Sequence, residues 1–470
     1  MAISFYNTLT RQKEPFKEIE PGKVRFYTCG PTVYDFAHIG NQKTFIVYDL
    51  IKRYLSYRGY EVNHIVNITD VEDKIISRIR DEGISREELT GRYEKAFFED
   101  MDTLNILPAD RFPRATEHIP EMVEMVGQLI EDGHAYKRGG SVYFSIPSFP
   151  TYGELARLDV AGLRTSAEGV DEDEYDKENA RDFVLWKAWK DEDGEVFWET
   201  DLGKGRPGWH MECSCMAIKY LGETIDIHGG GVDLVFPHHQ NEIAQSEALT
   251  GKPFANTWIH SAFINVDDEK MSKSLGNFLT IRDVVNSPDD ARAFRYLVAS
   301  SHYRTAFNFS AEVLEGAKST MRHLTNFRRR LAEVQKAEGG DDVTPLVRDA
   351  REAFVEHMDD DLNSPNAMAA VFGLVSDVED LLGEERMDRK GADLVDAFMD
   401  EINEVLGIFY TLPEDEVEET LPDDLLALIA EREEARKEKN WARSDEIRDQ
   451  FTEMGYVLED TPDGTAWKKA

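Results

Sequence analysis

Seven side chains in the sequence have the chemistry of metal ligands. The segment Phe-Pro-His-His-Gln-Asn-Glu at 236–242 places His238 and Glu242 four residues apart, so on a helix they share a face. Histidine, cysteine and glutamate all bind zinc. Spacing alone does not select four ligands from the full set, which is Cys29, Cys213, Cys215, His210, His238, His239 and Glu242. The alternative is that the cysteines are small buried hydrophobic residues and the histidine pair satisfies a turn.

The segment His-Ile-Gly-Asn at 38–41 is suited to bind an anion. It ends a loop containing glycine and proline, at the point where a helix is predicted over 42–57. The free N–H groups of a helix N-terminus attract a phosphate chain, and Gly40 allows the ligand to approach the backbone closely. His38 would hydrogen-bond a phosphate there. Taken alone, the motif indicates only a capping loop with an ordinary surface histidine.

The segment Lys-Met-Ser-Lys-Ser at 270–274 offers two ammonium groups and two hydroxyls within five residues. Such donors can hold a phosphate chain, and a loop can close over the ligand when it is present. A solvated charged turn is the alternative interpretation. The order of these residues, combined with the upstream His-x-Gly, favours a nucleotide site.

The elements that must position these motifs follow from hydrophobic patterning. Strands are predicted at 24–29 and 61–68 on either side of the helix at 42–57, which makes one βαβ unit with a parallel sheet. Strand-like runs return at 225–236 and 258–266. The sequence therefore predicts a nucleotide-type α/β fold that closes late, with an insertion between its halves.

The rest of the chain is predicted to be helical. Helices are expected from about 311 to 410, followed by an acidic, proline-containing linker at 411–424. One charged helix is predicted over 425–455, before a short strand-like tail. The expected domains are 1–265 with an insertion at about 120–200, a connective region at 266–310 that bears the Lys-Met-Ser-Lys-Ser segment, a helical bundle at 311–411, and a small C-terminal unit at 425–470.

The composition describes a strongly acidic globular protein. There are 92 acidic and 54 basic residues, a net charge of −38, and 41% of the chain is hydrophobic, which argues against wholesale disorder. Taken alone, the charge also argues against nucleic acids and anionic membranes as partners. No run approaches the roughly 18 apolar residues of a membrane span, and three cysteines are typical of a reducing compartment. We expect a cytoplasmic protein without a membrane partner.

Five segments of the chain together resemble cysteinyl-tRNA synthetase, a class I aminoacyl-tRNA synthetase, in their order and spacing. They are FYTCGPTVYDFAHIGN, NITDVEDKI, GWHMECSCM, DIHGGGVDLVFPHHQNEIAQ and DEKMSKSLGNFLTIRDV. The terminal WARSDEIRDQF and GYVLEDTPDGTAWK extend the similarity over nearly the whole chain. The resemblance implies an α/β, Rossmann-type class I catalytic domain with an insertion, followed by a helical bundle domain and a small C-terminal anticodon-binding unit.

The resemblance implies one zinc ion per chain. Its ligands would be Cys29, Cys213, His238 and Glu242. Cys215 stands where the family usually has a small residue, so it is interpreted as a bystander. Thr69 and Trp209 would wall the amino-acid pocket. Zinc binds a thiolate far better than a neutral hydroxyl, so it would distinguish cysteine from serine without an editing domain.

The activity implied is the ATP-dependent attachment of L-cysteine to tRNA(Cys) through cysteinyl-adenylate, with Mg²⁺ accompanying ATP. Catalysis would consist of positioning and of stabilising charge on the phosphates, without a nucleophilic side chain. The expected catalytic residues are His38, Lys270 and Lys273. The expected ATP-binding residues are His38, Gly40, Asn41, Gly229, Gly230, Gly231, Asp233 and Lys273. Asn41 stands where the signature usually has a second histidine.

The C-terminal unit would read the anticodon. Positions that match the family there are Arg436, Trp441, Asp445 and Asp460. The alternative is a solvated helix face with one anchoring tryptophan. Local basic clusters, such as the arginines at 328–330, would contact tRNA although the rest of the surface is acidic. The protein is expected to act as a monomer.

Two other functions stay open at this point. Cysteine:amino-sugar ligases of the mycothiol type share the catalytic core but lack a full anticodon-binding region. A catalytically silent paralogue that only binds tRNA or a nucleotide would keep the fold without the reaction. A cysteinylation assay on transcribed tRNA separates the three functions: the synthetase would charge tRNA, the amino-sugar ligase would activate cysteine without charging tRNA, and the silent paralogue would do neither.

The acidic composition also predicts adaptation to salt. Arginine outnumbers lysine, 31 to 23, within the acidic total. Many carboxylates and few lysines keep a surface hydrated in molar salt, so we expect the protein to come from a halophile with a salt-rich cytoplasm. At 1 M salt the Debye length is about 3 Å, so repulsion between surface carboxylates is largely screened.

We therefore expect the unfolding temperature to rise between dilute buffer and molar KCl. A thermal melt followed by circular dichroism over a KCl series measures this. Equal unfolding temperatures in dilute buffer and in molar KCl would contradict the prediction.

Overall fold

The computed structural model of the chain describes residues 2–158, 182–267, 269–271, 277–412, 415, 423–437, 440–454, 456–461 and 464–469. Contacts divide the chain into two units, Met1–Tyr410 and Thr411–Ala470. Each unit is described by itself below. Among the helices so described, none is both long and apolar enough to cross a membrane.

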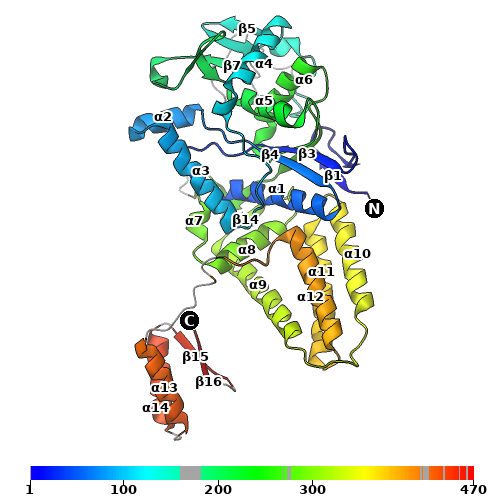
Figure 1. Ribbon diagram of the computed structural model, residues 1–470, viewed down its shortest axis with the longest axis vertical. Coiled ribbons are helices and arrows are strands. Elements are labelled where there is room, and N and C mark those ends of the chain that lie inside the picture. Colours follow the sequence, from blue (N-terminus) through cyan, green and yellow to red (C-terminus); the bar gives the residue numbers. More distant parts are fainter. Residues whose placement is uncertain are drawn as a thin grey trace. The chain divides into compact units, whose positions relative to one another are not determined.

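A four-stranded parallel sheet in the order β11-β10-β3-β4 forms the centre of the first unit. Its strands are β3 (Lys23–Thr28), β4 (Glu61–Val66), β10 (Ile225–Gly231) and β11 (Ala255–Ser261). Helix α1 (Ile39–Tyr57) covers one face, and α5 (Trp209–Leu221) and α6 (His238–Thr250) cover the other (Figure 1). The predicted parallel α/β sheet is confirmed. Ligands of such sheets bind at the carboxyl ends of the strands.

Helix α1 begins three residues before the predicted start because His38 caps it. The Asn41 backbone N–H donates to His38 Nδ1 (3.1 Å), and the His38 backbone N–H donates to Asn41 Oδ1 (3.2 Å). This reciprocal pair is a capping box, which satisfies two otherwise unpaired helix-terminal groups. The apolar face of the helix, including Ile46 and Ile51, is fully buried against the sheet. The His-Ile-Gly-Asn segment at 38–41, here called the first signature motif, is therefore fixed at the start of a core helix; the Lys-Met-Ser-Lys-Ser segment at 270–274 is the second.

A long insertion separates β4 from β10. It contains α2 (Asp73–Glu82), α3 (Arg86–Thr103) and α4 (Ile119–Glu131). It also contains an antiparallel sheet in the order β5-β6-β7-β9-β8. The strands are β5 (Ala135–Arg138), β6 (Ser141–Phe144), β7 (Phe183–Ala188), β8 (Trp198–Thr200) and β9 (Gly203–Pro207). Short 3₁₀ helices lie at Ala115–His118, Ile146–Ser148, Asp191–Asp193 and Val232–Val235.

Smaller elements surround the sheet. A hairpin near the N-terminus pairs β1 (Ser4–Asn7) with β2 (Gln12–Pro15). A three-stranded sheet joins β12 (Ile264–Val266), β13 (Glu269–Lys270) and β14 (Phe307–Phe309). The short helix α7 (Ile281–Val284) and the longer α8 (Pro288–Ala299) follow the second signature motif. That motif thus begins at Lys270, where β13 ends.

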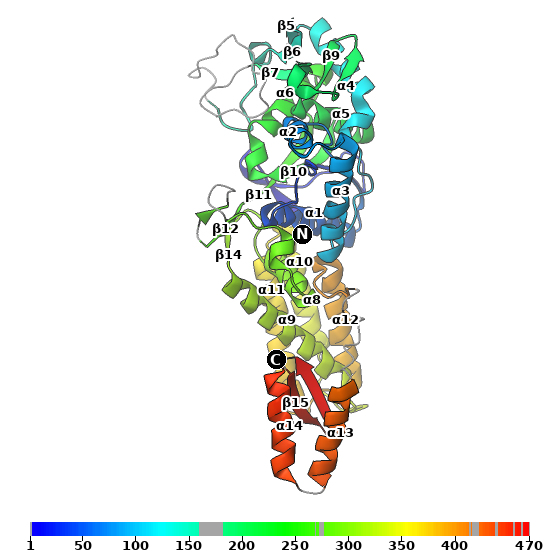
Figure 2. The same ribbon diagram turned by 90° about the vertical axis from the view of Figure 1, so that its left-hand side faces the viewer.

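Four helices form the predicted bundle. They are α9 (Ala311–Ala332), α10 (Thr344–Asp359), α11 (Ser364–Gly383) and α12 (Arg389–Leu406). They lie side by side in both views (Figures 1 and 2), with apolar residues such as Phe327, Phe354 and Phe398 buried between them.

The second unit contains two helices where the sequence predicted one. Helix α13 (Asp423–Lys437) is followed by α14 (Trp441–Glu453) and by a hairpin of β15 (Tyr456–Thr461) and β16 (Gly464–Lys469). The prediction of a single helix over 425–455 is wrong because Asn440 caps α14, accepting from the Arg443 backbone N–H at 3.4 Å. Asparagine is favoured at such caps.

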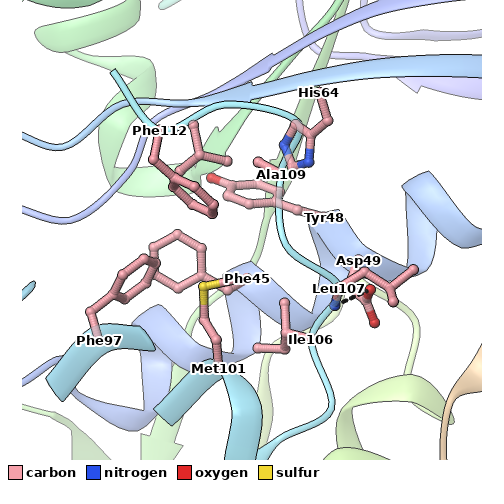
Figure 3. Close-up of a pocket in the computed structure, with 11 residues that line it drawn as sticks. Phe45, Tyr48, Asp49, His64, Phe97, Met101, Ile106, Leu107, Ala109 and Phe112 are labelled. Carbon is pink, nitrogen blue, oxygen red and sulfur yellow. Dashed lines mark hydrogen bonds between the residues drawn. The ribbon is translucent and has the colours of Figure 1, made fainter. Parts of the chain in front are cut away.

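One pocket of the first unit lies between α1, α3, β4 and the loop at 106–112 (Figure 3). Its walls are mainly apolar and include Phe45, Phe97 and Phe112. Two of its polar members bond within the fold: Asp49 Oδ1 accepts from the Leu107 backbone N–H (2.9 Å), and His64 Nε2 lies 2.9 Å from Thr28 Oγ1. The Tyr48 hydroxyl, also in the lining, is buried without a hydrogen-bond partner among the described residues. The pocket lies in the apolar packing between α1 and the sheet.

A buried guanidinium joins the sheet to the bundle. Arg295 of α8 and Asp49 of α1 are fully buried and lie 2.5 Å apart (Arg295 Nη2 to Asp49 Oδ2). Arg295 also donates to the backbone carbonyls of Leu406 (2.9 Å), Leu104 (2.8 Å) and Asn105 (2.9 Å). These bonds satisfy the buried cation and connect α1, α8, the end of α3 and the end of α12.

We expect Arg295→Met to destabilise the protein by about 3–5 kcal/mol, because it leaves the buried Asp49 carboxylate with Arg53 as its remaining cationic partner and removes the donor to three backbone carbonyls. Urea unfolding, compared at a constant slope, measures the loss. The matched control is Arg329→Met on α9, which removes only an exposed pair with Glu333 and is expected to leave the midpoint unchanged. A midpoint that moves equally little in both variants would contradict the prediction.

Candidate active site and metal centre

The residues singled out in the sequence meet at the carboxyl ends of the sheet strands. Cys29 directly follows β3, and Thr69 lies just beyond β4. The adjacent strand β10 ends in Gly229–Gly231, and its residue Gly229 accepts from the Cys29 backbone N–H (3.3 Å). Helices α5 and α6 bring Cys213, His238 and Glu242 to the same place.

The structure places four buried ligand atoms close together. The sulfur, nitrogen and carboxylate oxygen atoms of Cys29, Cys213, His238 and Glu242 all lie within 4.8 Å of one another. Four ligands of a single tetrahedral zinc, each about 2.0–2.3 Å from the ion, have this kind of spacing. Two thiols, an imidazole and a carboxylate are a donor set that suits zinc. The residues present therefore fit such an ion.

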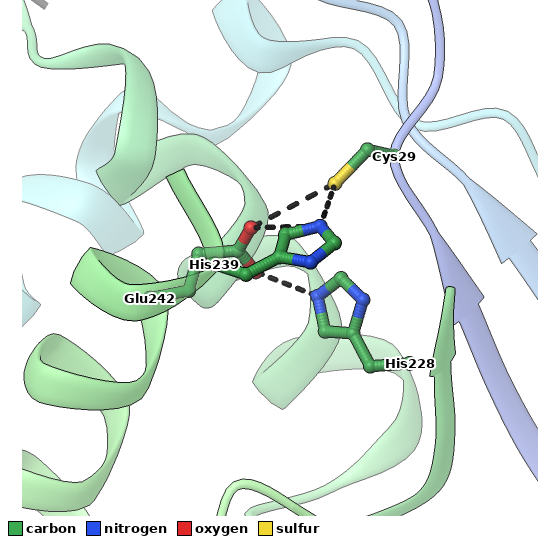
Figure 4. A group of neighbouring side chains, drawn as sticks. All are labelled: Cys29, His228, His239 and Glu242. Atoms are coloured by element: carbon green, nitrogen blue, oxygen red, sulfur yellow. Dashed lines mark hydrogen bonds and ion pairs between the residues drawn. The ribbon is translucent and has the colours of Figure 1, made fainter. Parts of the chain in front are cut away.

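A second set of four shares two of these residues. It consists of Cys29, His228, His239 and Glu242 (Figure 4). His239 Nε2 lies 3.2 Å from Cys29 Sγ, and His228 Nε2 lies 2.7 Å from Glu242 Oε2. The other nitrogen of His239 lies 2.8 Å from His260 Nε2. No role was predicted for His228, although it lies within the DIHGGG segment, because a residue in a buried strand gives no sign in the sequence of which face it occupies.

The electrostatics of the cluster favour a cation. Burial disfavours charge, but His228 and His238 hold the pKa of Glu242 at about 2. Burial likewise opposes ionisation of Cys213, yet a hydrogen bond from Cys29 and the nearby His238 lower its pKa. Burial lowers the pKa of His238, but the nearby Glu242 and Cys213 raise it by more, so the pKa is about 10. A proton on His238 thus supplies positive charge beside the Glu242 carboxylate and the Cys213 thiol.

Two other candidate ligands lie outside these sets. Burial raises the pKa of Cys215 to about 12, and neither set of four within the described residues includes it. His210 Nδ1 lies 2.9 Å from His238 Nδ1, so His210 contacts the candidate ligand His238.

The two expected pocket residues flank the cluster. The Trp209 ring centroid is 4.2 Å from that of His238. The Thr69 hydroxyl donates to Glu212, the residue before Cys213 on α5, with Oγ1 3.0 Å from Oε2. Both therefore lie beside the candidate metal ligands.

The two signature motifs lie against each other. A side chain at Gly40 would meet the His38 ring at 3.0 Å and Met271 Cε at 3.4 Å. The Ile39 backbone N–H donates to the Leu279 carbonyl (2.9 Å), and the His38 and Phe278 rings are 5.3 Å apart. Lys273 lies outside the described residues, and of Lys270 only the backbone is described, at the end of β13.

The glycines at 229–231 are closely packed. A Cβ on Gly230 would lie 2.3 Å from His239 Cε1, and a Cβ on Gly231 would lie 2.4 Å from Asp233 Oδ1. Gly230 and Gly231 therefore have no room for a side chain in this packing. Their contact with adenosine, and that of Asp233, stays a prediction.

The expected anticodon residues lie in the second unit. Trp441 begins α14 and is 58% exposed, which opposes the alternative that it is a packing anchor. Asp445 is exposed one helical turn later, and Arg436 is half-buried on α13. Asp460 belongs to β15, and its side chain lies outside the description.

The three arginines at 328–330 do not form a free basic cluster. Arg328 pairs with Asp396 (2.7 Å) and Asp400 (2.6 Å), Arg329 with Glu333 (2.5 Å), and Arg330 with Glu379 (3.2 Å). The expectation that they meet tRNA as a local positive patch is not supported, because neighbouring carboxylates offset their charges.

Family models match three regions of the chain. A model described as the tRNA synthetases class I (C) catalytic domain matches 15–319, a DALR domain matches 353–410, and the cysteinyl-tRNA ligase anticodon binding domain matches 418–467. Among solved structures, Mycobacterium tuberculosis methionyl-tRNA synthetase with methionyl-adenylate has a TM-score of 0.60 at 15% identity, covering 82% of this chain and 90% of that chain. An Agrobacterium radiobacter LeuRS–tRNA complex has a TM-score of 0.60 at 10% identity, covering 84% and 85%. These two structures share the fold.

Full-length relatives agree with the family models. The chain is 46% identical to a cysteine–tRNA ligase of Protochlamydia amoebophila over 99% of this chain and 98% of that protein. It is 47% identical to one of Brevibacillus brevis, covering both chains completely. The chain belongs to the cysteine–tRNA ligase family of class I tRNA synthetases.

Proposed function

We propose that this protein attaches L-cysteine to tRNA(Cys) at the expense of ATP, by way of cysteinyl-adenylate. The observation that carries the proposal is the buried cluster of two cysteines, a histidine and a glutamate at the carboxyl ends of β3 and β10, in a member of the cysteine–tRNA ligase family. This cluster suits the one substrate atom, the thiol sulfur, that distinguishes cysteine from serine.

Zinc would be held by Cys29, Cys213, His238 and Glu242, and when bound it supplies a coordination position that takes a thiolate far better than a hydroxyl. His228 orients Glu242 by its 2.7 Å contact with the second carboxylate oxygen. Such contacts fix a ligand's geometry. Trp209 and Thr69 would confine the amino acid beside the cluster.

The phosphates of ATP would lie at the N-terminus of α1, together with Mg²⁺. Asn41 fixes the His38 ring by donating its backbone N–H to Nδ1, so in the neutral ring the proton is on Nε2, which can donate to a phosphate oxygen. Lys270 and Lys273 would add positive charge from the second signature motif. Gly40, Gly229–Gly231 and Asp233 would hold the nucleotide. His38, Lys270 and Lys273 would then act by positioning the phosphates and by stabilising their charge.

The second unit favours tRNA over an amino sugar as the acceptor. Its match to an anticodon-binding model, together with the exposed Trp441 ring, supports base stacking by this unit. Arg436, Asp445 and Asp460 would add hydrogen bonds to the anticodon. All three cysteines are free thiols, which suits a reducing compartment. We therefore place the reaction in the cytoplasm. We expect the protein to act there as a monomer.

The metal assignment predicts opposite results for two neighbouring cysteines. Cys213→Ser removes a proposed ligand, so bound zinc, measured by mass spectrometry of the purified protein, is expected to fall from one per chain to well below one. Cys215→Ser is the matched control on the same helix and is expected to retain one zinc. Loss of zinc in Cys215→Ser with retention in Cys213→Ser would reject the assignment.

The overall function is tested by aminoacylation of transcribed tRNA(Cys) with cysteine and with serine, with and without a zinc chelator. We expect cysteine to be charged, and serine to be disfavoured on the order of 10⁴-fold. We expect the chelator to abolish charging. Cysteine-dependent ATP–pyrophosphate exchange without tRNA charging would instead indicate the amino-sugar ligase, and neither activity would indicate a silent paralogue.

A further inference from the structure

A series of hydrogen bonds, all donated in the same direction, passes through Thr69. The Gly30 backbone N–H donates to Asn67 Oδ1 (2.9 Å), Asn67 Nδ2 donates to Thr69 Oγ1 (3.1 Å), and the Thr69 hydroxyl donates to Glu212 Oε2 (3.0 Å). The three side chains are almost completely buried. Asn67 and Thr69 lie in the segment that follows β4, Glu212 lies on α5, and the Gly30 backbone lies in the segment that follows β3, so the hydrogen bonds join these three parts of the chain.

The direction of each bond is fixed by its first member. A backbone N–H can only donate, so the Asn67 oxygen must face Gly30 and the Asn67 amide group must face Thr69. A threonine hydroxyl has one hydrogen and two lone pairs. The hydrogen is used on the Glu212 carboxylate, and one lone pair accepts from Asn67. Thr69 therefore has capacity only to accept one further hydrogen bond.

The partner for that acceptor follows from the chemistry of the proposed substrate, so the inference rests on the proposed function. Bound cysteine has a sulfur, a carboxylate and an α-ammonium group, and at neutral pH only the ammonium donates strong hydrogen bonds. Charge-assisted bonds of this kind are stronger than neutral ones, and a chain of hydrogen bonds polarises its members.

We propose that Glu212, acting through Thr69 and assisted by Asn67, makes this edge of the site an acceptor for the substrate's α-ammonium group. Thr69 is then the contact residue, while Glu212 and Asn67 are positioning residues. The site consequently selects α-amino thiols over thiol acids that lack the amino group. A purely structural role would instead be limited to tying the segments after β3 and β4 to α5.

Glu212→Gln separates these roles. A glutamine amide can donate to Thr69, which would fill both lone pairs and turn the hydroxyl hydrogen toward the ligand, where it would oppose an ammonium group. Titration calorimetry on the full-length, zinc-loaded protein compares L-cysteine with 3-mercaptopropionate, which lacks the amino group. We expect Glu212→Gln to weaken cysteine binding by about tenfold to a hundredfold and to change 3-mercaptopropionate binding by less than about twofold.

Two further variants test the same step without altering Glu212. Thr69→Val, which removes the acceptor, is expected to lose the preference for cysteine over 3-mercaptopropionate, while Thr69→Ser, which keeps the hydroxyl, is expected to retain it. Glu247→Gln on α6 is the matched control: this half-buried carboxylate accepts from the Phe254 backbone N–H (3.0 Å), and its loss is expected to change neither ligand. Zinc content is measured in every variant.

Equal weakening of both ligands in Glu212→Gln and Thr69→Val would overturn the inference, because it would show a structural role only. Unchanged cysteine binding in both would overturn it as well. Failure of the proposed function gives a different result, since the unaltered protein would then not charge tRNA(Cys) with cysteine.

Discussion

The buried carboxylate of Glu242, with the Cys213 thiol of lowered pKa beside it, sets the main constraint on this structure. A charge without water must be paired or bound to a metal. The surrounding histidines meet this demand in part, and four ligand atoms within 4.8 Å allow a cation to meet it fully. The parallel sheet positions this cluster, since Cys29 directly follows β3 and His228 lies in the adjacent strand β10.

The nucleotide side of the site depends on the same sheet through α1. The capping box between His38 and Asn41 fixes the start of that helix, and Gly40 lies against Met271 of the second signature motif. Further along α1, Asp49 is held by the buried Arg295, which also binds the carbonyl of Leu406 at the end of the bundle. Helix α1 therefore connects the proposed phosphate site at its N-terminus to the end of the bundle, from which the chain continues into the second unit.

Local patterns predicted the central elements well, because the βαβ unit has short strands, a periodic helix and a loop with clear boundaries. They did not reduce seven candidate ligands to four, since that choice depends on how α5 and α6 pack on the sheet. The role of His228 was missed because a residue in a buried strand gives no sign of which face it occupies. The error at α13 and α14 arose because helical periodicity continues through Asn440. The pairing of the arginines at 328–330 was not foreseen because the carboxylates that face Arg328 and Arg330 are distant in sequence.

X-ray absorption at the zinc edge, recorded on the zinc-loaded protein with and without L-cysteine, tests the central claim most directly. Ligation by Cys29 and Cys213 predicts two sulfur neighbours for zinc in the free protein and three when cysteine is bound. One sulfur neighbour in the free protein would instead indicate the set with His228 and His239. A sulfur count that does not rise when cysteine is added would contradict direct recognition of the substrate thiol.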